Sequence, residues 1–306
     1  MKSLKQKSIK FLVTDIFYIV MMILPIVTGV VLQVLTKPAS DGVSISGARI
    51  FFTVPMPIQD FPVTESQINS ALVLIVIFFF CLFMTHGLSE KCTLKRQHFA
   101  ELIIEKADAL VNENMGEYFK GFTPFIIAIM ALSAFSSLLS LFGLFPPTSD
   151  INVVGGWAIL VFILITYYKM KCGPVYYLKG FAEPVALLAP INFISEFATP
   201  VSMAFRHYGN VLSGSVISVL LGTALAALSS MVLGWLPGFL GDFPLFQVGI
   251  PAILSIYFDV FSGLLQAFIF AMLTMMYVSG GFPMDEYEKR KLKKAQKAKA
   301  ALKNSK

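Results

Sequence analysis

The sequence is poor in charged residues, cysteine and histidine. Of its 306 residues, 14% are charged, three are cysteine and three are histidine. The cysteines have no CxxC or Cys/His spacing and the histidines form no HExxH, so we expect neither a metal nor another cofactor. The chain also has no glycine-rich P-loop, so any nucleotide chemistry must belong to a partner. This shortage of charge argues against an ordinary soluble domain.

Apolar residues dominate instead. They make up 56% of the chain, and the mean hydropathy is +0.75. No long soluble segment separates the apolar runs, so we predict one membrane domain over residues 1–306. Its fold class is an all-α polytopic membrane protein with about six transmembrane helices. We expect these spans at residues 11–35, 68–88, 122–145, 151–168, 184–232 and 249–278.

The segments between the spans differ in character. Residues 36–66 are rich in Pro, Ser and Thr, which predicts an exposed loop. Residues 285–306 form a basic tail, helical or frayed in solvent. The segment 89–120 has apolar residues at helical spacing, which predicts an amphipathic helix on the membrane surface or on a partner. An ordinary solvated helix in a loop is equally compatible with this pattern. The apolar positions are Phe99, Leu102, Ile103, Ala107, Leu110 and Val111.

The run at residues 184–232 is nearly free of charge and too long for one upright span. At about 1.5 Å per residue it far exceeds a hydrocarbon core of about 30 Å. We therefore expect it to tilt strongly, to bend at Pro190 or Pro200, or to lie partly along the interface. Together with the last span it would form a long tilted helical hairpin near the C-terminus.

Arg206 lies in the middle of this long run. A charge at bilayer depth costs at least ~2.5–3.5 kcal/mol, and arginine cannot escape that cost by losing its proton. One interpretation is a static pair with a carboxylate that holds helices together. The other is that the charge handles ions, protons or a counter-charge.

The residues around Arg206 favour the second interpretation. In helical projection, every position that shares its side of the helix is small or polar. Such residues let helices pack closely, or they face a wet cavity or a moving partner, and the central arginine favours the latter. We call this set the Arg206 face: Ser195, Thr199, Ser202, Arg206, Gly209, Asn210 and Ser213.

Two carboxylates accompany Arg206 in the apolar runs. Glu196 precedes it by ten residues, roughly 15 Å along a straight helix. Asp259 in the last span shares a projected face with Ser262, Gly263 and Gln266. If Gln266 is level with Arg206, Asp259 lies roughly 10 Å beyond it on the other side. The carboxylates would then bracket the arginine, which suits two separate aqueous inlets divided by a fixed positive charge.

Several segments resemble a known family. INFISEFATPVSMAFRHYGNVLSG at residues 191–214 and LLQAFIFAMLTMMYVSGG at residues 264–281 are similar to the signature segments of subunit a of F-type ATP synthases. FPPTSDIN at 145–152 and FAEPVALLAPIN at 181–192 fit as well. The resemblance covers residues 68–280, so residues 11–35 are an extra N-terminal span.

The resemblance implies a bacterial cell-membrane stator subunit that gives a rotating ring of c subunits two half-channels for an ion, the proton by expectation. Further partners would be the b subunits of the peripheral stalk, the other ATP synthase subunits and the lipid bilayer, with no nucleic acid. Arg206 corresponds to the essential arginine, and Asn210 and Gln266 to its polar neighbours. Asp259 falls in the outer inlet and Glu196 in the inner path. We include Ser202, on the Arg206 face, among the ion-path candidates.

The chain departs from the family at two positions. His207 stands where the family has leucine, and Ser215 where it has Glu or His. By this alignment the outer inlet has one ionisable group fewer. His207 is a speculative substitute, although it points ~100° away from Arg206. A hydrogen-bonded packing residue is the other interpretation of His207.

Two other classes of membrane protein can carry charged residues within their spans. A self-contained ion-coupled secondary transporter would also carry intramembrane Arg, Asp and Glu. However, the sequence shows no internal repeat and no pair of interrupted helices in equivalent halves. An intramembrane enzyme would need a Ser/His, Asp/Asp or HExxH arrangement at depth, which the sequence lacks. The chain by itself is therefore expected to be non-catalytic.

The distribution of positive charge predicts the topology. With six spans, 21 of the 24 Lys and Arg residues fall on one side, Lys37 and Arg49 on the other, and Arg206 within the membrane. The positive-inside rule then places both termini in the cytoplasm.

Protease added to right-side-out vesicles should therefore leave tags on both termini intact. Loss of the N-terminal tag through cleavage near residue 39 during export would instead identify residues 11–35 as a signal peptide.

Overall fold

The expected six spans are present in the computed structural model. It describes residues 2–36, 47–57, 59–88, 94–171, 173–181, 186–235, 246, 249, 253–254 and 256–304. Six helical segments within these ranges are long and apolar enough to cross a membrane, which confirms the all-α polytopic fold class. They are Phe11–Thr36, Glu65–Thr85, Glu117–Phe142, Ile151–Met170, Ala189–Leu233 and Ile256–Gly280.

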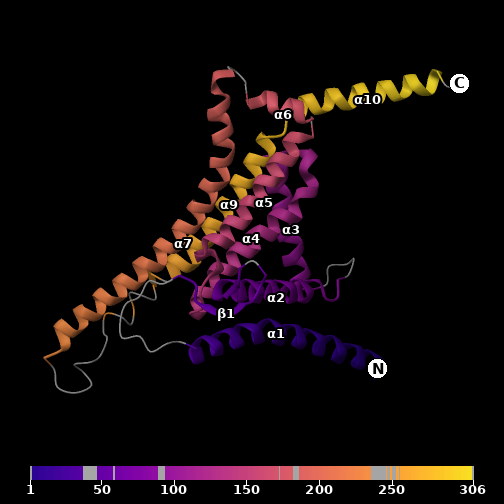
Figure 1. Cartoon of the computed structure of the whole chain (residues 1–306). Helices are drawn as coiled ribbons and strands as arrows, with labels where there is room; N and C mark the ends of the chain where they lie inside the picture. The colour runs from indigo at the N-terminus through magenta and orange to yellow at the C-terminus, as the bar shows by residue number, and fades with distance from the viewer. Residues whose placement is uncertain are drawn as a thin grey trace.

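The first two long helices form an antiparallel pair that crosses the direction of the others (Figure 1). Helix α1 (Lys2–Thr36) packs along α2 (Glu65–Thr85). Near the start of α1, the Asp15 carboxylate lies 2.8 Å from both Arg96 Nη1 and His86 Nδ1. Further along, Gly29 approaches Leu72 so closely that a Cβ would lie 2.9 Å from Leu72 Cδ1. Helix α1 is thus held to α2 by close packing and to Arg96, in α3 (Lys95–Met115), by an ion pair.

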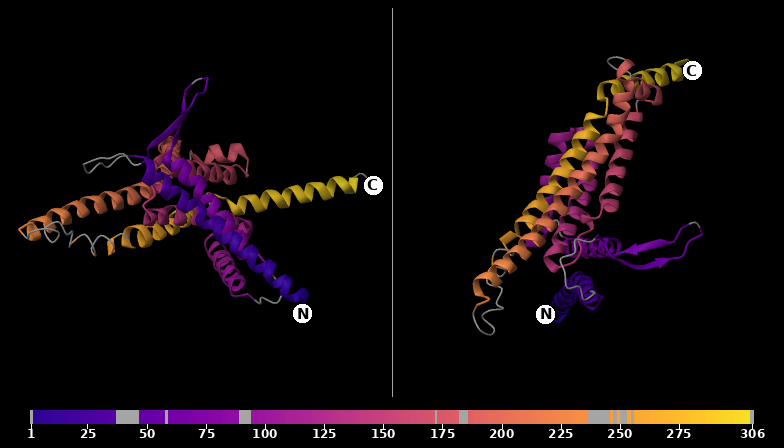
Figure 2. Two further views of the ribbon diagram at one scale, coloured as in Figure 1. Left: turned by 90° about the horizontal axis from the view of Figure 1, so that it is seen from below. Right: turned by 60° about the vertical axis from the view of Figure 1, so that its left-hand side comes forward.

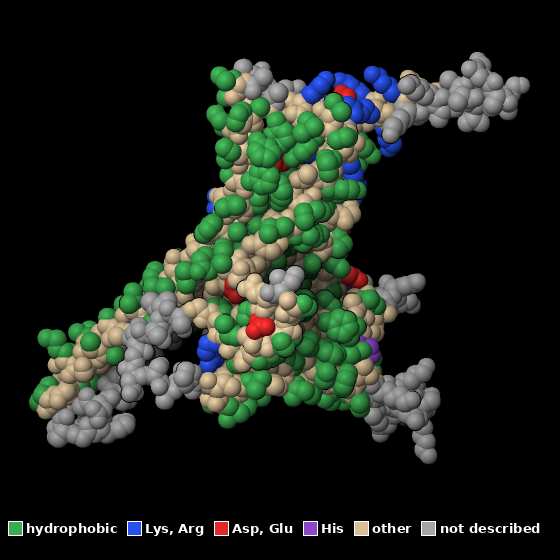
Figure 3. All heavy atoms as spheres, viewed as in Figure 1, with side chains coloured by type: hydrophobic (Ala, Val, Ile, Leu, Met, Phe, Trp, Pro, Cys, Tyr) green, Lys and Arg blue, Asp and Glu red, His purple; other side chains and the backbone are tan. Residues whose placement is uncertain are grey.

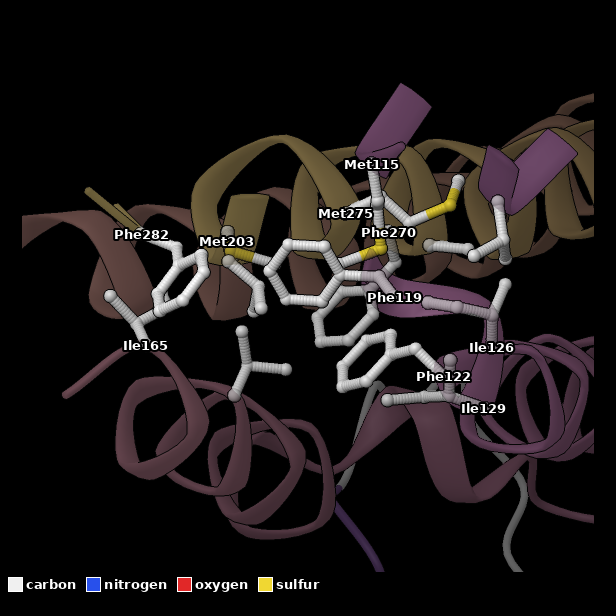
Figure 4. Close-up of a cluster of buried hydrophobic side chains, with 14 residues drawn as sticks. Met115, Phe119, Phe122, Ile126, Ile129, Ile165, Met203, Phe270, Met275 and Phe282 are labelled. Atoms are coloured by element: carbon white, nitrogen blue, oxygen red, sulfur yellow. The ribbon is translucent and has the colours of Figure 1, made fainter. Parts of the chain in front are cut away.

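The remaining spans form a bundle whose main apolar core is shown in Figure 4. Its helices are α4 (Thr123–Leu138), α5 (Ile151–Met170), α7 (Ala189–Leu233) and α9 (Gly263–Gly280). Helix α4 packs mainly on α9, and α5 mainly on α7. The core gathers large side chains from several of these helices and from the short helix η1 (Glu117–Phe122). Its labelled members in Figure 4 are Met115, Phe119, Phe122, Ile126, Ile129, Ile165, Met203, Phe270, Met275 and Phe282.

Helix α7 has 45 residues and is continuous. At about 1.5 Å per residue it is more than twice as long as a hydrocarbon core of about 30 Å, so it cannot stand upright in a membrane. Figures 1 and 2 show it running obliquely beside α9 and changing direction in its first part. Pro200 lies inside the helix, and a proline within a helix is a common cause of such a bend. The predicted long tilted hairpin is therefore confirmed.

The segment 89–120 contains the expected helix, α3 (Lys95–Met115). Its C-terminal part packs into the bundle core through Val111 and Met115. Phe99, Leu102 and Ile103 are instead exposed apolar side chains, as expected for a helix that lies on a membrane surface. The basic tail is also helical, as α10 (Met284–Asn304). Figure 3 shows Lys and Arg side chains gathered where α10 begins beside α6 (Pro174–Phe181), above faces that are mostly hydrophobic.

The prediction of an exposed loop at residues 36–66 was wrong in part. Strands β1 (Ile50–Val54) and β2 (Phe61–Thr64) pair as an antiparallel hairpin, and α2 already begins at Glu65. The run IFFTV consists of β-branched and aromatic residues, which favour strands, but the surrounding Pro, Ser and Thr dominated the composition. Arg49, next to β1, donates to the Glu65 carboxylate at 3.0 Å and so ties the hairpin to α2.

The last span also differs in detail from a simple α-helix. Residues Ile256–Ser262 form a π-helix, η7, which continues directly into α9. Because a π-helix bonds i to i+5 rather than i+4, its side chains do not follow the 100° projection used for the sequence. The projected alignment of Asp259 with Gln266 on one face therefore does not hold through this segment.

Candidate functional site

Arg206 lies on the side of α7 that is turned away from the bundle core. The Arg206 face has no buried member: Ser195, Ser202, Arg206, Asn210 and Ser213 are exposed, and Thr199 and Gly209 are half-buried. The opposite side of the helix buries Met203, Ala204 and His207. Among the described residues, the Arg206 side chain has no ion pair and no hydrogen bond. Within the described ranges, the charge is thus presented outward and is not neutralised.

Asn210 and Gln266 join α7 to α9 one helical turn from Arg206. The Asn210 Nδ2 donates to Gln266 Oε1 at 2.7 Å. Gln266 is 2% exposed, whereas Asn210 is exposed. This hydrogen bond fixes the register of the two helices, and it places Gln266 near the level of Arg206, as the sequence argument assumed.

Glu196 lies in a cavity at the end of the bundle where α9 finishes. The cavity has a volume of about 530 Å³. Both carboxylate oxygens of Glu196 accept from Lys169 Nζ, at 2.8 Å for Oε1 and 2.6 Å for Oε2. Ser195 and Thr199 from the Arg206 face also line it, so the cavity reaches to within two helical turns of the arginine. We call it the inner cavity; its other lining residues include Tyr177, Asn192, Gly280 and Gly281.

Two residues of the inner cavity were missed by the sequence argument. Lys169 was counted only as a positive charge near the end of a span, and its pairing with Glu196 spans 27 residues of sequence. Tyr177 belongs to the short helix α6 that covers the cavity. Burial, with the nearby negative charge of Glu196, raises the pKa of the Tyr177 hydroxyl. Tyr177 therefore keeps its proton at neutral pH and stays uncharged beside the ion pair.

Asp259 lies at the other end of the contact between α7 and the last span. It is half-buried in the π-helix η7. The next residue back, Phe258, packs against Gly214, where a Cβ would lie 3.2 Å from the phenyl ring. Gly214 is two turns beyond Arg206 on α7, while Glu196 precedes Arg206. The structure therefore brings Asp259 and Glu196 to opposite sides of the Asn210–Gln266 hydrogen bond and does not bring them together.

His207 and Ser215 lie in different surroundings. His207 is fully buried, and its Nε2 lies 3.2 Å from Ser133 Oγ on α4. Its ring meets Trp157 and Phe270 edge-on, with centroids 6.0 and 5.5 Å away. These are the surroundings of a packing residue. Ser215 is exposed, and its hydroxyl donates to the Leu212 carbonyl at 2.8 Å.

Comparison with known proteins gives one family. Residues 68–279 match the sequence profile of the ATP synthase A chain. The chain is 29% identical over 275 residues to "ATP synthase subunit a, sodium ion specific" of Propionigenium modestum, covering 79% of this chain and 88% of that protein. It is 31% identical over 231 residues to "ATP synthase subunit a" of Priestia megaterium, covering 71% of this chain and 92% of that protein.

The buried position of His207 generates a test of its role. His207→Leu removes the contact with Ser133 and replaces the imidazole with an apolar side chain of similar size. We expect ion transport by the assembled complex to persist, with a stability loss of about 1–3 kcal/mol, because the buried Ser133 hydroxyl loses its partner. The measurement is ATP-driven ion uptake in membrane vesicles, with assembly checked on native gels. Loss of transport in a fully assembled variant would place His207 in the ion path.

Proposed function

This chain belongs to the ATP synthase A chain family, and we propose that Arg206 is the fixed charge that separates two ion inlets in it. Its function is that of an ion-conducting stator subunit of the F-type ATP synthase, and it is a multi-pass membrane protein that works with other subunits of that complex. The observation that carries the proposal is the exposed Arg206 side chain, which has no partner among the described residues.

The proposed partner of Arg206 is a carboxylate carried by each subunit of a rotating c-ring. The Arg206 face supports this, because its small and polar residues permit close approach of another helix. A bare carboxylate moving through lipid is too costly, so each ring site must be neutralised by an ion before it leaves the interface. Arg206 attracts the site that has lost its ion. Since arginine does not release its proton, it also blocks direct leakage between the inlets.

The two inlets are proposed at the two carboxylates. An ion enters from outside near Asp259, with Ser215 along the same path, and neutralises a ring carboxylate. A site that completes the circuit releases its ion into the inner cavity beside Glu196, past Ser202. Each elementary charge that crosses at 100 mV supplies about 2.3 kcal/mol, so several ions are needed for each nucleotide. Asn210 and Gln266 hold α7 and α9 in register at the point where Arg206 meets the ring.

The remaining assignments are proposals of the same kind. Residues 68–280 form the ion-conducting part, and residues 11–35 add a span in front of it. With both termini on the cytoplasmic side of the bacterial cell membrane, the tail 285–306 would lie near anionic headgroups or the b subunits of the peripheral stalk. The proton is the proposed coupling ion. Because the relative from P. modestum is named sodium ion specific, Na⁺ is the second candidate, and uptake measured with and without Na⁺ separates them.

Substitution of Arg206 tests the central proposal. Arg206→Ala should abolish ion-coupled ATP synthesis while the complex still assembles, because the ring carboxylate loses its counter-charge. Arg206→Lys should also be severely impaired, since a lysine here can lose its proton and lacks the planar guanidinium. ATP synthesis driven by an imposed ion gradient is the measurement. A variant that assembles at normal levels and still couples synthesis to the gradient would refute the role of Arg206.

Accessibility from each side tests the two inlets. In a background that lacks Cys81, Cys92 and Cys172, single cysteines at Asp259 and at Glu196 should react with membrane-impermeant thiol reagents from opposite sides. The reagent should reach position 259 from outside and position 196 from the cytoplasm. A cysteine at the buried Ser133 serves as the unreactive control. Labelling of both positions from one side would eliminate the two-inlet assignment.

A further inference from the structure

We propose that Lys169 is a tethered cation that keeps metal ions off Glu196 in the inner cavity. It would be a specificity-determining residue of the inner inlet, and the inference rests on the function proposed above. Lys169 lets the coupling ion pass the inlet without a metal cation being retained at the only carboxylate among the described residues that line the cavity.

The Lys169 ammonium occupies the position that a bound cation would take at the Glu196 carboxylate. One ammonium group donates to both oxygens of one carboxylate, at 2.6 and 2.8 Å. The two side chains are 27% and 11% exposed, so most of the pair is withdrawn from solvent. Hydrogen bonds between two charged groups are shorter and stronger than neutral ones. A free cation that approaches the Glu196 carboxylate must compete with this ammonium for both oxygens.

The end of α9 leaves space for the Lys169 side chain beside Glu196. Lys169 lies in the last turn of α5, and it reaches Glu196 on α7 by passing the end of α9. A Cβ at Gly281 would lie 2.9 Å from Lys169 Cε, so the absence of a side chain there leaves space for the lysine stem. At Gly280, which also lines the cavity, a Cβ would meet nothing within 4 Å.

A nearby lysine shows that positive charge alone does not explain this arrangement. Lys171, two residues further on, donates to the Tyr118 hydroxyl at 3.1 Å. Its ammonium also lies over the rings of Tyr167 and Tyr168. It is not among the residues that line the inner cavity. Either lysine satisfies the positive-inside rule, but only Lys169 is directed at the carboxylate.

The inner cavity without Lys169 would have the chemistry of a hard-cation site. Beside the Glu196 carboxylate it is lined by oxygen-bearing side chains, namely Tyr177, Asn192, Ser195 and Thr199. Carboxylate, amide carbonyl and water oxygens are the ligands that Ca²⁺ selects, and it tolerates irregular geometry. Removal of the lysine should therefore create a site at which a divalent cation from the cytoplasm blocks the exit.

Calcium inhibition of the complete complex tests this inference. In inverted vesicles, whose cytoplasmic face is outward, ATP-driven ion uptake is followed with pH-sensitive and sodium-sensitive dyes while CaCl₂ is titrated at constant Mg-ATP. Lys169→Met should lower the half-inhibiting Ca²⁺ concentration by about tenfold, because a charged hydrogen-bond partner no longer competes. Lys169→Arg and the matched control Lys171→Met should respond as the wild type, with the catalytic subunits identical throughout.

A double variant assigns the effect to Glu196. In Lys169→Met/Glu196→Gln the cation loses its carboxylate ligand, so the half-inhibiting Ca²⁺ concentration should return to that of the wild type. Two results would overturn the inference. One is an active Lys169→Met complex with the wild-type Ca²⁺ response. The other is a double variant that stays as sensitive as the single one.

A chemical restoration of the charge covers the case in which Lys169→Met fails to assemble. Lys169→Cys in the cysteine-free background is assayed before and after reaction with a positively charged thiol reagent. Restored charge should raise the half-inhibiting Ca²⁺ concentration in the same assembled protein, and no change would count against Lys169. Failure of the proposed function is distinguishable, because it would appear as transport that survives Arg206→Ala, whatever the Ca²⁺ response.

Discussion

The packing of α7 leaves one positive charge, Arg206, exposed and without a partner among the described residues. The two carboxylates nearest to Arg206 along the helices are placed elsewhere. Both oxygens of Glu196 are engaged by Lys169, and Asp259 lies beyond the Asn210–Gln266 hydrogen bond. Neither carboxylate therefore serves as a counter-charge for Arg206 among the described residues. An arginine neutralised internally would only hold helices together.

The inclination of α7 follows from its length. Its 45 residues exceed one upright span of a hydrocarbon core of about 30 Å. The inclined helix is held on one side by α5 and α9 and by buried residues such as Met203 and His207. Its other side carries Arg206 and its small or polar neighbours, none of which is buried. His207 follows Arg206 in the sequence but lies on the side of α7 that packs into the bundle. There its ring contacts Ser133, Trp157 and Phe270.

Three features of the structure were not predicted from the sequence, each for a different physical reason. The β-hairpin was hidden because Pro, Ser and Thr surround the short run IFFTV. The π-helix at Ile256–Ser262 was missed because hydrophobic periodicity assumes α-helical turns. Lys169 was interpreted only as one of the positive charges that set the topology. No local pattern predicted its contact with Glu196, which lies 27 residues further along the chain. The α-helical spans were predictable because long apolar runs in a bilayer have few other solutions.

The sequence by itself determined the number of spans, the class of the protein and the charge that matters, because hydrocarbon thickness and the cost of a buried charge are properties of single segments. Only the tertiary structure decided which charge meets which. Lys169 and Glu196 meet because α5 and α7 pack side by side and Gly281 leaves room between them. Arg206 remains unpaired among the described residues because the same packing turns it outward. Such pairings depend on how helices are rotated and inclined, and those angles are set by contacts between distant residues.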